Sequence, residues 1–591
     1  MEIKSICVVG GGRMGRQIAL NAAIYGFEAS VYDLSEKVCA DIQAWADDYM
    51  AGRVKKGRMT QEQADKVMSL FHVETDLKKA CENADCAIEA VVEREDVKRT
   101  VLGQLSDLMR EDAIIATNSS VMPSSKFADC VKNPARLCNM HYYNPALVLK
   151  FVEVVQGPHT SEETAKACVD FCLATGKKPA WMRKEIGGFL GNYIYGGITM
   201  TAKQLVNDGV CSPYDADNAL EYGFGAKMGV FRTNDLTGID LSLDMMRNQT
   251  AKTGVKSLML DHYEKMVAEG RLGKGCGRGW YDYDKDPRGT IPPEYMPTAD
   301  PDAQVEYKEI QTVAVVGAGA MGRQIAMQAA ICGYPVALQD AFPEGLEKAK
   351  AWAEEYLAGR IAKGRMTEEQ VAGIKARLRF ENDLEAAVKG ADLIIEAIFE
   401  DLDLKKDLFR KICAIVPEDV ILATNASVHP SSKLADAVTN PSRLCNMHFY
   451  NPALVMKFVE IVQGPHTAAA TARAAYEFCL KLDKIPAWLK KEVPGFLGNH
   501  IWGAFVKRCD YLVSEGYCTP QDVDCAMEHG FGYKMGPYRI ADLTGIDTRF
   551  RRMKLAYEKT GEKGLMYDVY EEMVAKGHLG VKSGKGFYDY K

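Results

Sequence analysis

Two glycine-rich stretches decide how this chain folds. Residues 6–15 read ICVVGGGRMG, and residues 313–322 read VAVVGAGAMG. In each, a short apolar run typical of a buried strand leads through glycines into a helical pattern. Glycine permits the tight strand-to-helix turn and lets backbone N–H groups approach an anion at the start of the helix. The same strand–turn–helix element is therefore predicted twice in one chain.

The repetition extends well beyond the glycines. Residues 138–160 read CNMHYYNPALVLKFVEVVQGPHT, and residues 445–467 read CNMHFYNPALVMKFVEIVQGPHT, with three differences in 23 positions. The offset between the matched histidines is 448 − 141 = 307, and the offset between the first glycines is 317 − 10 = 307. A register this constant indicates a tandem duplication, with one copy at 1–284 and the other at 308–591.

Each copy changes its pattern partway along. The first part alternates short β-rich apolar runs with helical stretches, which is typical of a parallel sheet with crossover helices. The last part shows longer helical segments and few strand signals. We therefore predict an α/β Rossmann-type domain followed by an all-α C-terminal domain, with this pair duplicated in tandem. The predicted domains are 1–186 and 187–284 in the first copy and 308–493 and 494–591 in the second, joined by an extended, proline-rich linker at 285–307.

Bulk composition excludes several classes of protein. With 591 residues, of which 47% are hydrophobic and 26% charged, the chain has the composition of a globular protein of several domains. Its formal net charge of −7 argues against nucleic-acid binding. The apolar runs stop short of membrane-spanning length, and the first residues lead into a strand pattern without a signal peptide. We expect neither a nucleic acid nor a membrane as a partner.

The 17 cysteines are spread through the chain and form no CxxC pair. Many lie in apolar runs, as Cys7, Cys332 and Cys413 do. Buried free thiols, and hence a reducing cytoplasm, explain them better than a disulfide scaffold does. The few histidines do not pair with cysteines at ligand spacing, so no metal site is predicted.

An acidic residue follows each glycine motif at the end of the next apolar run. It is Asp33 in SVYD and Asp340 in ALQD. In a dinucleotide-binding fold this carboxylate accepts hydrogen bonds from the ribose hydroxyls and repels a 2′-phosphate, which favours NAD over NADP. The glycine motif alone would also fit a simple strand-to-helix turn. The predicted cofactor-binding residues are Gly10, Gly12, Met14, Gly15 and Asp33, matched by Gly317, Gly319, Met321, Gly322 and Asp340.

Side chains suited to alcohol oxidation recur at the same offset. His141 lies in NMHYYNP, and Glu153 follows twelve residues later, after a turn that could bring the two together. A neutral imidazole accepts a hydroxyl proton near neutral pH, and a carboxylate on its far nitrogen fixes the tautomer. Ser120 in ATNSS and Asn192 in GGFLGN supply donors for a substrate oxygen. The counterparts in the second copy are His448, Glu460, Ser427 and Asn499.

Each of these residues also has a purely structural interpretation. A single histidine on a strand is commonly structural, a glutamate in KFVEV could face solvent, and serine or asparagine often caps a helix. Their joint recurrence beside a dinucleotide motif favours the catalytic interpretation.

On these residues, both copies closely resemble the L-3-hydroxyacyl-CoA dehydrogenase family, including its bacterial 3-hydroxybutyryl-CoA dehydrogenases. The segments NMH[YF]YNP, KFVE and PGF…N carry the resemblance, which covers about 280 residues of each copy. It implies NAD-dependent interconversion of (S)-3-hydroxyacyl-CoA and 3-ketoacyl-CoA, with short acyl chains and two active sites per chain. It also implies the roles of the residues: the histidines are the bases, the glutamates orient them, the serines bind the 3-oxygen, and the asparagines complete the site.

The resemblance implies further site residues. Asn144 and Asn451, in the YNP turns, match an active-site asparagine, while Glu93 and Lys98 match residues on the nicotinamide side, as Glu400 and Lys405 do. A helical hairpin between the second and third strands would contact CoA through a basic cluster, although a solvated helix end would look the same. The cluster comprises Arg53, Lys56 and Arg58, matched by Arg360, Lys363 and Arg365.

Two departures from the family pattern concern substrate fit. The first copy has Gly187 where the second has Pro494, which predicts a looser entry to the helical domain, and Tyr193 and His500 replace the usual arginine. Two alternatives stay open: a 3-hydroxy substrate without CoA, or one copy that is only a scaffold or a cofactor sensor. Because the family dimerises through its helical domain, we expect the two helical domains of this chain to pack as an intramolecular pseudo-dimer.

Overall fold

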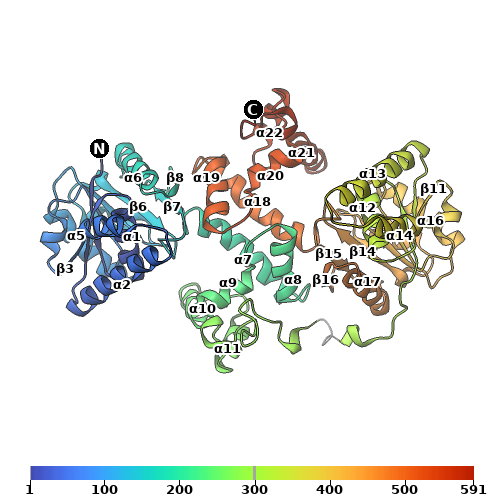
Figure 1. The fold of residues 1–591 in the computed structure, drawn as a ribbon, viewed down its shortest axis with the longest axis horizontal. Helices are drawn as coiled ribbons and strands as arrows, with labels where there is room; N and C mark the ends of the chain where they lie inside the picture. The colour runs from blue at the N-terminus through green and yellow to red at the C-terminus, as the bar shows by residue number, and fades with distance from the viewer. Residues whose placement is uncertain (1, 297–300, 591) are drawn as a thin grey trace. The chain divides into compact units, whose positions relative to one another are not determined.

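The computed structural model describes residues 2–296 and 301–590. It contains two eight-stranded sheets, each of which is surrounded by helices in Figure 1. Their strand orders are β3-β2-β1-β4-β5-β6-β7-β8 and β11-β10-β9-β12-β13-β14-β15-β16. In each sheet the only antiparallel pair of described strands is the sixth with the seventh in this order. The first sheet comprises β1 Ser5–Val9, β2 Glu28–Tyr32, β3 Phe71–Glu74, β4 Cys86–Glu89, β5 Ile114–Thr117, β6 Leu137–Tyr142, β7 Phe151–Val155 and β8 Lys178–Met182. The second comprises β9 Val313–Val316, β10 Val336–Gln339, β11 Leu378–Glu381, β12 Leu393–Glu396, β13 Ile421–Thr424, β14 Leu444–Phe449, β15 Phe458–Val462 and β16 Ile485–Leu489.

Helices cover both faces of each sheet, which explains why the strands read as nearly continuous apolar runs. In the first sheet, Ile18, Met50 and Phe171 belong to the core on one face, and Leu102 and Phe127 to the core on the other. The helices of the first Rossmann-type domain are α1 Arg13–Ile24, α2 Glu36–Lys55, α3 Gln61–Ser69, α4 Leu77–Cys81, α5 Glu95–Leu108 and α6 Glu162–Ala174. Those of the second are α12 Ala320–Ile331, α13 Pro343–Ala362, α14 Glu368–Arg377, α15 Leu384–Val388, α16 Leu402–Ile415 and α17 Ala469–Lys481.

The remainder of each copy is helical, and the predicted fold class is confirmed. Glycines Gly254 and Gly561 in left-handed conformation end the two fifteen-residue helices of these segments, α10 and α21. The first copy contributes α7 Gly191–Asn207, α8 Pro213–Asn218, α9 Val230–Thr237, α10 Ile239–Thr253 and α11 Leu260–Ala268. The second contributes α18 Gly498–Ser514, α19 Pro520–Cys525, α20 Pro537–Thr544, α21 Ile546–Thr560 and α22 Tyr567–Ala575.

The chain forms two compact units whose limits differ from those of the two copies. The first compact unit is Met1–Gly197 with Phe505–Lys591, and the second is Ile198–Ala504. Within the first unit, α19 of the second copy lies beside β8 of the first, and within the second unit α8 lies beside β16 (Figure 1). Each Rossmann-type sheet therefore packs against helices that the sequence assigns to the other copy.

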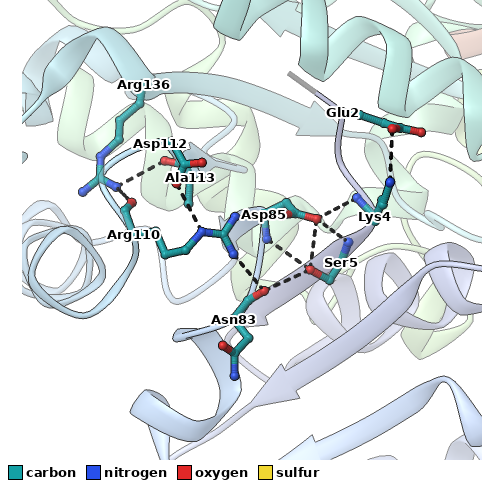
Figure 2. Close-up of polar contacts among 9 residues, drawn as sticks. All are labelled: Glu2, Lys4, Ser5, Asn83, Asp85, Arg110, Asp112, Ala113 and Arg136. Atoms are coloured by element: carbon teal, nitrogen blue, oxygen red, sulfur yellow. Dashed lines mark hydrogen bonds and ion pairs between the residues drawn. The ribbon is translucent and has the colours of Figure 1, made fainter.

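A polar cluster aligns the amino-terminal ends of the central strands. Asp85, just before β4, accepts the backbone N–H groups of Lys4 and Ser5 at 2.8 and 3.0 Å and an N–H of Arg110 at 2.8 Å (Figure 2). In the second sheet Asp392 accepts two backbone N–H groups in the same way, at 3.0 Å each. These bonds fix β1 against β4 at the amino-terminal edge of the sheet, opposite the glycine-rich turn. Ligands of this type of sheet bind at the carboxyl-terminal edge.

Several smaller expectations can be compared with the structure. In its described part the predicted linker contains two short 3₁₀ turns, Pro293–Tyr295 and Pro301–Gln304, and an isolated antiparallel bridge of Thr290 to Asp282, while residues 297–300 lie outside the described residues. All 17 cysteines are free, and Cys7 is buried, but Cys332 and Cys413 are partly exposed because they lie near helix ends. Among the described helices, none is both long and apolar enough to cross a bilayer.

Candidate active site

A histidine and a glutamate face each other in each antiparallel strand pair. His141 in β6 is the register partner of Glu153 in β7, and its Nδ1 lies 2.5 Å from Glu153 Oε2. His448 and Glu460 repeat this arrangement, also at 2.5 Å. Both glutamates are fully buried, and both histidines are nearly so. The structure therefore brings together the two residues that the sequence paired across the NPAL turn.

The second carboxylate oxygen of each glutamate accepts backbone hydrogen bonds from the start of the helical domain. Glu153 Oε1 accepts the N–H of Gly191 at 2.6 Å, where α7 begins. In the second copy, Glu460 Oε1 accepts the N–H groups of Leu497 and Gly498 at 2.9 and 2.8 Å. Because an ionised carboxylate only accepts hydrogen bonds, His141 Nδ1 carries the proton and leaves Nε2 free to accept another. This arrangement suits a general base.

A tyrosine packs on each histidine. The ring of Tyr143 lies 4.6 Å from that of His141, and the ring of Tyr450 lies 5.1 Å from that of His448. Burial, followed by the nearby Glu153 carboxylate, raises the pKa of Tyr143 well above its ordinary value, and Glu460 acts likewise on Tyr450. Both phenols therefore stay neutral and do not compete with imidazole as the base.

The predicted serines lie in the loops that follow β5 and β13, and the predicted asparagines Asn192 and Asn499 are the second residues of α7 and α18. The amide of Asn192 donates to the backbone oxygen of Ser120 at 3.5 Å, the limit of a hydrogen bond, and Asn192 directly follows Gly191. Ser120 is half-buried, whereas Asn192 and Asn144 are exposed. In the second copy, Ser427 is half-buried and Asn499 and Asn451 are exposed. The structure thus brings Ser120 and Asn192 together and leaves the asparagine side chains open to a ligand.

The glycine-rich turn has the geometry that a pyrophosphate requires. Gly10 has φ = 111°, and a Cβ added to Gly15 would lie 1.8 Å from the oxygen of Gly10, so neither position accepts another side chain. Asp33 Oδ2 accepts the N–H of Gly11 at 2.9 Å and so sits against the turn. Gly12 begins α1 without a side-chain cap and has open space beside it. A helix start with uncapped N–H groups and free space fits an anion.

The second turn repeats this geometry. Gly317 has φ = 106°, a Cβ on Gly322 would lie 1.8 Å from the oxygen of Gly317, and Gly319 opens onto free space. Asp340 Oδ2 accepts the N–H of Ala318 at 2.8 Å. Met14 and Met321 are partly buried against the core beneath the turns. The residues predicted to bind a dinucleotide are thus assembled in both copies.

The predicted lysines near the cofactor are buried in ion pairs. Lys98 is 1% exposed, and its Nζ lies 2.8 Å from Glu89 Oε1 and 3.1 Å from Glu93 Oε2. Glu89 also accepts the hydroxyl of Thr117 at 2.6 Å. Lys405 pairs in the same way with Glu396 and Glu400. Lys98 therefore does not lie on a solvated helix face. It forms an ion pair, from a buried position, with Glu93, whose side chain is 38% exposed.

Sequence analysis missed Glu89 and Thr117, together with Glu396 and Thr424. All four end fully buried strands at the same edge of the sheet, and each repeats at the 307-residue offset. An acid that ends an apolar strand in both copies was the available signal, because a buried carboxylate requires a partner.

The basic cluster lies where it was predicted, in the hairpin of α2 and α3 between β2 and β3. A capping box of Thr60 and Gln63 begins α3. Arg53 is partly buried, and Lys56 and Arg58 are exposed. The matched residues Arg360, Lys363 and Arg365 have the same exposure. Their assignment to CoA stays a prediction that rests on charge.

The fold and the buried histidine–glutamate pairs define an NAD-dependent dehydrogenase of alcohols. The chain belongs to the 3-hydroxyacyl-CoA dehydrogenase family. The family's NAD binding domain matches residues 5–186 and 312–493, and its C-terminal domain matches residues 188–283 and 495–590. The tandem duplication and the NAD cofactor that the sequence predicted are therefore confirmed.

Relatives of known name align with about half of the chain. A probable 3-hydroxybutyryl-CoA dehydrogenase of Bacillus subtilis is 35% identical over 284 residues, which make up 48% of this chain and 98% of that protein. One of Deinococcus radiodurans is 37% identical over 279 residues, 47% of this chain and 99% of that protein. The crystal structure of an Escherichia coli 3-hydroxybutyryl-CoA dehydrogenase aligns with 98% of this chain and 99% of that one, with a TM-score of 0.63 and 21% identity. At that identity the similarity concerns the fold.

The buried lysine pair yields a stability prediction. Lys98→Met leaves the fully buried Glu89 without its cation, and we expect the free energy of unfolding of the first compact unit to fall by about 3–5 kcal/mol. The double variant Glu89→Gln/Lys98→Met should recover most of this loss, because no unpaired charge remains. Urea denaturation followed by hydrogen exchange in β4 measures both.

Lys405→Met is the matched control. It should lower the protection from hydrogen exchange in β12 and leave that of β4 unchanged. Unchanged stability combined with a raised KM for NADH would contradict the structural role and mark Lys98 as a cofactor contact.

Proposed function

We propose that this chain carries two working active sites, one per copy, that interconvert (S)-3-hydroxyacyl-CoA and 3-ketoacyl-CoA with a preference for short acyl chains. The observation that carries the proposal is the pair of buried histidine–glutamate contacts with equal 2.5 Å distances. A copy that served only as a scaffold would not need to keep a buried carboxylate paired with an imidazole, because such a pair is costly to desolvate.

The residues of the first site divide the reaction between them. In the oxidising direction, His141 Nε2 accepts the proton of the substrate 3-hydroxyl, and Glu153 stabilises the imidazolium that forms. Ser120 and Asn192 hold the 3-oxygen as it becomes a ketone. Bound NAD⁺ supplies the acceptor for the hydride that leaves C3. In reduction, protonated His141 returns the proton to the same oxygen.

The preference for short acyl-CoA rests on relatives and on charge. The two relatives described above are named as probable 3-hydroxybutyryl-CoA dehydrogenases. The exposed bases Lys56 and Arg58, with Lys363 and Arg365, offer cations to the phosphates of CoA on a chain of net charge −7.

Substrate selectivity tests this part of the proposal. With NADH, we expect acetoacetyl-CoA to give the highest kcat/KM in a series of 3-ketoacyl-CoAs from about C4 to C16, and free acetoacetate to react at least about a hundredfold more slowly. Steady-state kinetics on the full chain measure both. Comparable rates with free acetoacetate would contradict the thioester, and a maximum at long chains would contradict the short-chain preference.

Single and double substitutions count the active sites. His141→Gln and His448→Gln should each leave roughly half of the turnover, because the other base is intact, while the double variant should lose at least about a thousandfold. Circular dichroism verifies that each variant is folded. If either single substitution abolishes all activity in a folded chain, the other copy does not turn over.

We also propose that the two helical domains pair within one chain as a pseudo-dimer. In the first compact unit, Arg508 of α18 donates to the backbone oxygen of Tyr193 in α7 at 2.5 Å, and its guanidinium lies 4.7 Å from the Tyr193 ring. Tyr193 is one of the two residues that depart from the family pattern. A covalent link keeps such partners at high effective concentration.

Arg508→Glu tests the pairing. We expect a lower midpoint of thermal unfolding and an unchanged molar mass by light scattering, because the broken contact lies inside one chain. A mass that falls by half would show that the contact joins two chains and would contradict the pseudo-dimer.

A further inference from the structure

An aromatic ring from the opposite copy lies behind each histidine–glutamate pair. In the first compact unit, Phe531 follows the π-helical turn η11, Ala526–Gly530, of the second copy. Its ring lies 5.7 Å from that of Tyr143, at 77°. The Tyr143 ring lies 4.6 Å from that of His141. One intervening ring therefore separates Phe531 from the histidine.

Phe531 also contacts the group that holds the glutamate. A Cβ added to Gly191 would lie 2.8 Å from the Phe531 ring and 2.3 Å from the Tyr143 hydroxyl. The N–H of Gly191 is the donor to Glu153 Oε1. The ring of Phe531 therefore packs against both Tyr143 and Gly191, and close-packed interiors transmit small displacements.

Directional bonds fix this segment against the first sheet. The N–H of Trp181 in β8 donates to Asp522 Oδ1 at 3.0 Å, and the N–H of Arg183 donates to the oxygen of Tyr517 at 2.7 Å. A Cβ added to Gly530 would lie 2.8 Å from the ring of Phe151, in the strand that carries the glutamate. The segment is thus held close to β7 and β8, and Phe531 has little freedom to move.

The second compact unit contains the reciprocal arrangement. Phe224 follows the π-helical turn η3, Ala219–Gly223, of the first copy, and its ring lies 5.8 Å from that of Tyr450, at 86°. A Cβ added to Gly498 would lie 3.0 Å from the Phe224 ring, and the N–H of Gly498 donates to Glu460. The two phenylalanines keep the duplication offset, 531 − 224 = 307. The same contacts therefore occur twice, in two separate environments.

We propose that Phe531 is a positioning residue for His141 and Glu153, and that Phe224 is the positioning residue for His448 and Glu460. Each helical segment thereby completes the active site of the other copy. The inference rests on the proposed function only in treating both pairs as catalytic. It follows that each site depends on a residue of the other copy, 531 − 141 = 390 positions away in the first site and 448 − 224 = 224 positions away in the second. Neither copy then holds a complete site of its own.

Crossed double variants test the proposal in the full chain. His448→Gln leaves only the first site active, and His141→Gln leaves only the second. Phe531→Ala should lower kcat at least about tenfold in the His448→Gln chain and less than about twofold in the His141→Gln chain. Phe224→Ala should show the opposite dependence. KM for NADH should stay unchanged, because the contacts described above for both rings lie at the tyrosine and at the first glycine of the long helix.

Two further measurements separate positioning from general destabilisation. Phe531→Tyr keeps the ring and should restore kcat in the His448→Gln chain to within about threefold. The NMR resonance of the His141 Nδ1 proton, assigned by its loss in His141→Gln, should shift or broaden in Phe531→Ala while that of His448 stays in place. This resonance is observed without turnover. An inactive copy would therefore overturn the proposal of two working sites, and the resonance would still test whether Phe531 positions His141.

The proposal is overturned if Phe531→Ala impairs both sites equally, impairs only the second site, or leaves the His141 resonance and the kcat of the first site unchanged. Selective loss at the first site, mirrored by Phe224→Ala at the second, supports it.

Discussion

The bond between a buried imidazole and a buried carboxylate organises each half of this molecule. A fully buried glutamate must have its oxygens satisfied, or its desolvation would cost several kcal/mol. Glu153 uses one oxygen for His141 and the other for the N–H of Gly191. One carboxylate therefore joins two strands of the sheet to the first turn of α7. The bonds that position the proton acceptor His141 are therefore also the bonds that attach the helical domain to the sheet.

Much of this architecture could be predicted from local patterns. The glycine motifs, the apolar strands and the polar residues at strand ends all follow from the periodicity of neighbouring residues, and the structure places them as expected. Buried charge was harder to predict. Glu89 and Lys98 lie nine residues apart, on a strand and the following helix, and a helical lysine usually indicates solvent. Only the packing of α5 on the sheet reveals that this lysine neutralises a carboxylate.

The exchange of helical segments could not be predicted from either copy. Both copies contain the same pattern of strands and helices, so pattern alone cannot tell whether η11 packs on the first sheet or on the second. The choice depends on contacts between residues about 390 positions apart, such as Phe531 with Tyr143. Each compact unit combines segments of both copies.

The two halves have diverged around a constant pair. Ser119 donates to Glu93 in the first copy, but Ala426 stands at its counterpart, where Glu400 accepts the N–H of Val428 instead. Burial lowers the pKa of Lys203 to about 8, and its counterpart Asp510 pairs with Arg549. Lys203 lies in the compact unit that contains the second sheet, and Asp510 lies in the unit that contains the first, so this difference alters the surroundings of the other copy's sheet. Both differences leave the imidazole–carboxylate bond and the donor at the start of each long helix in place.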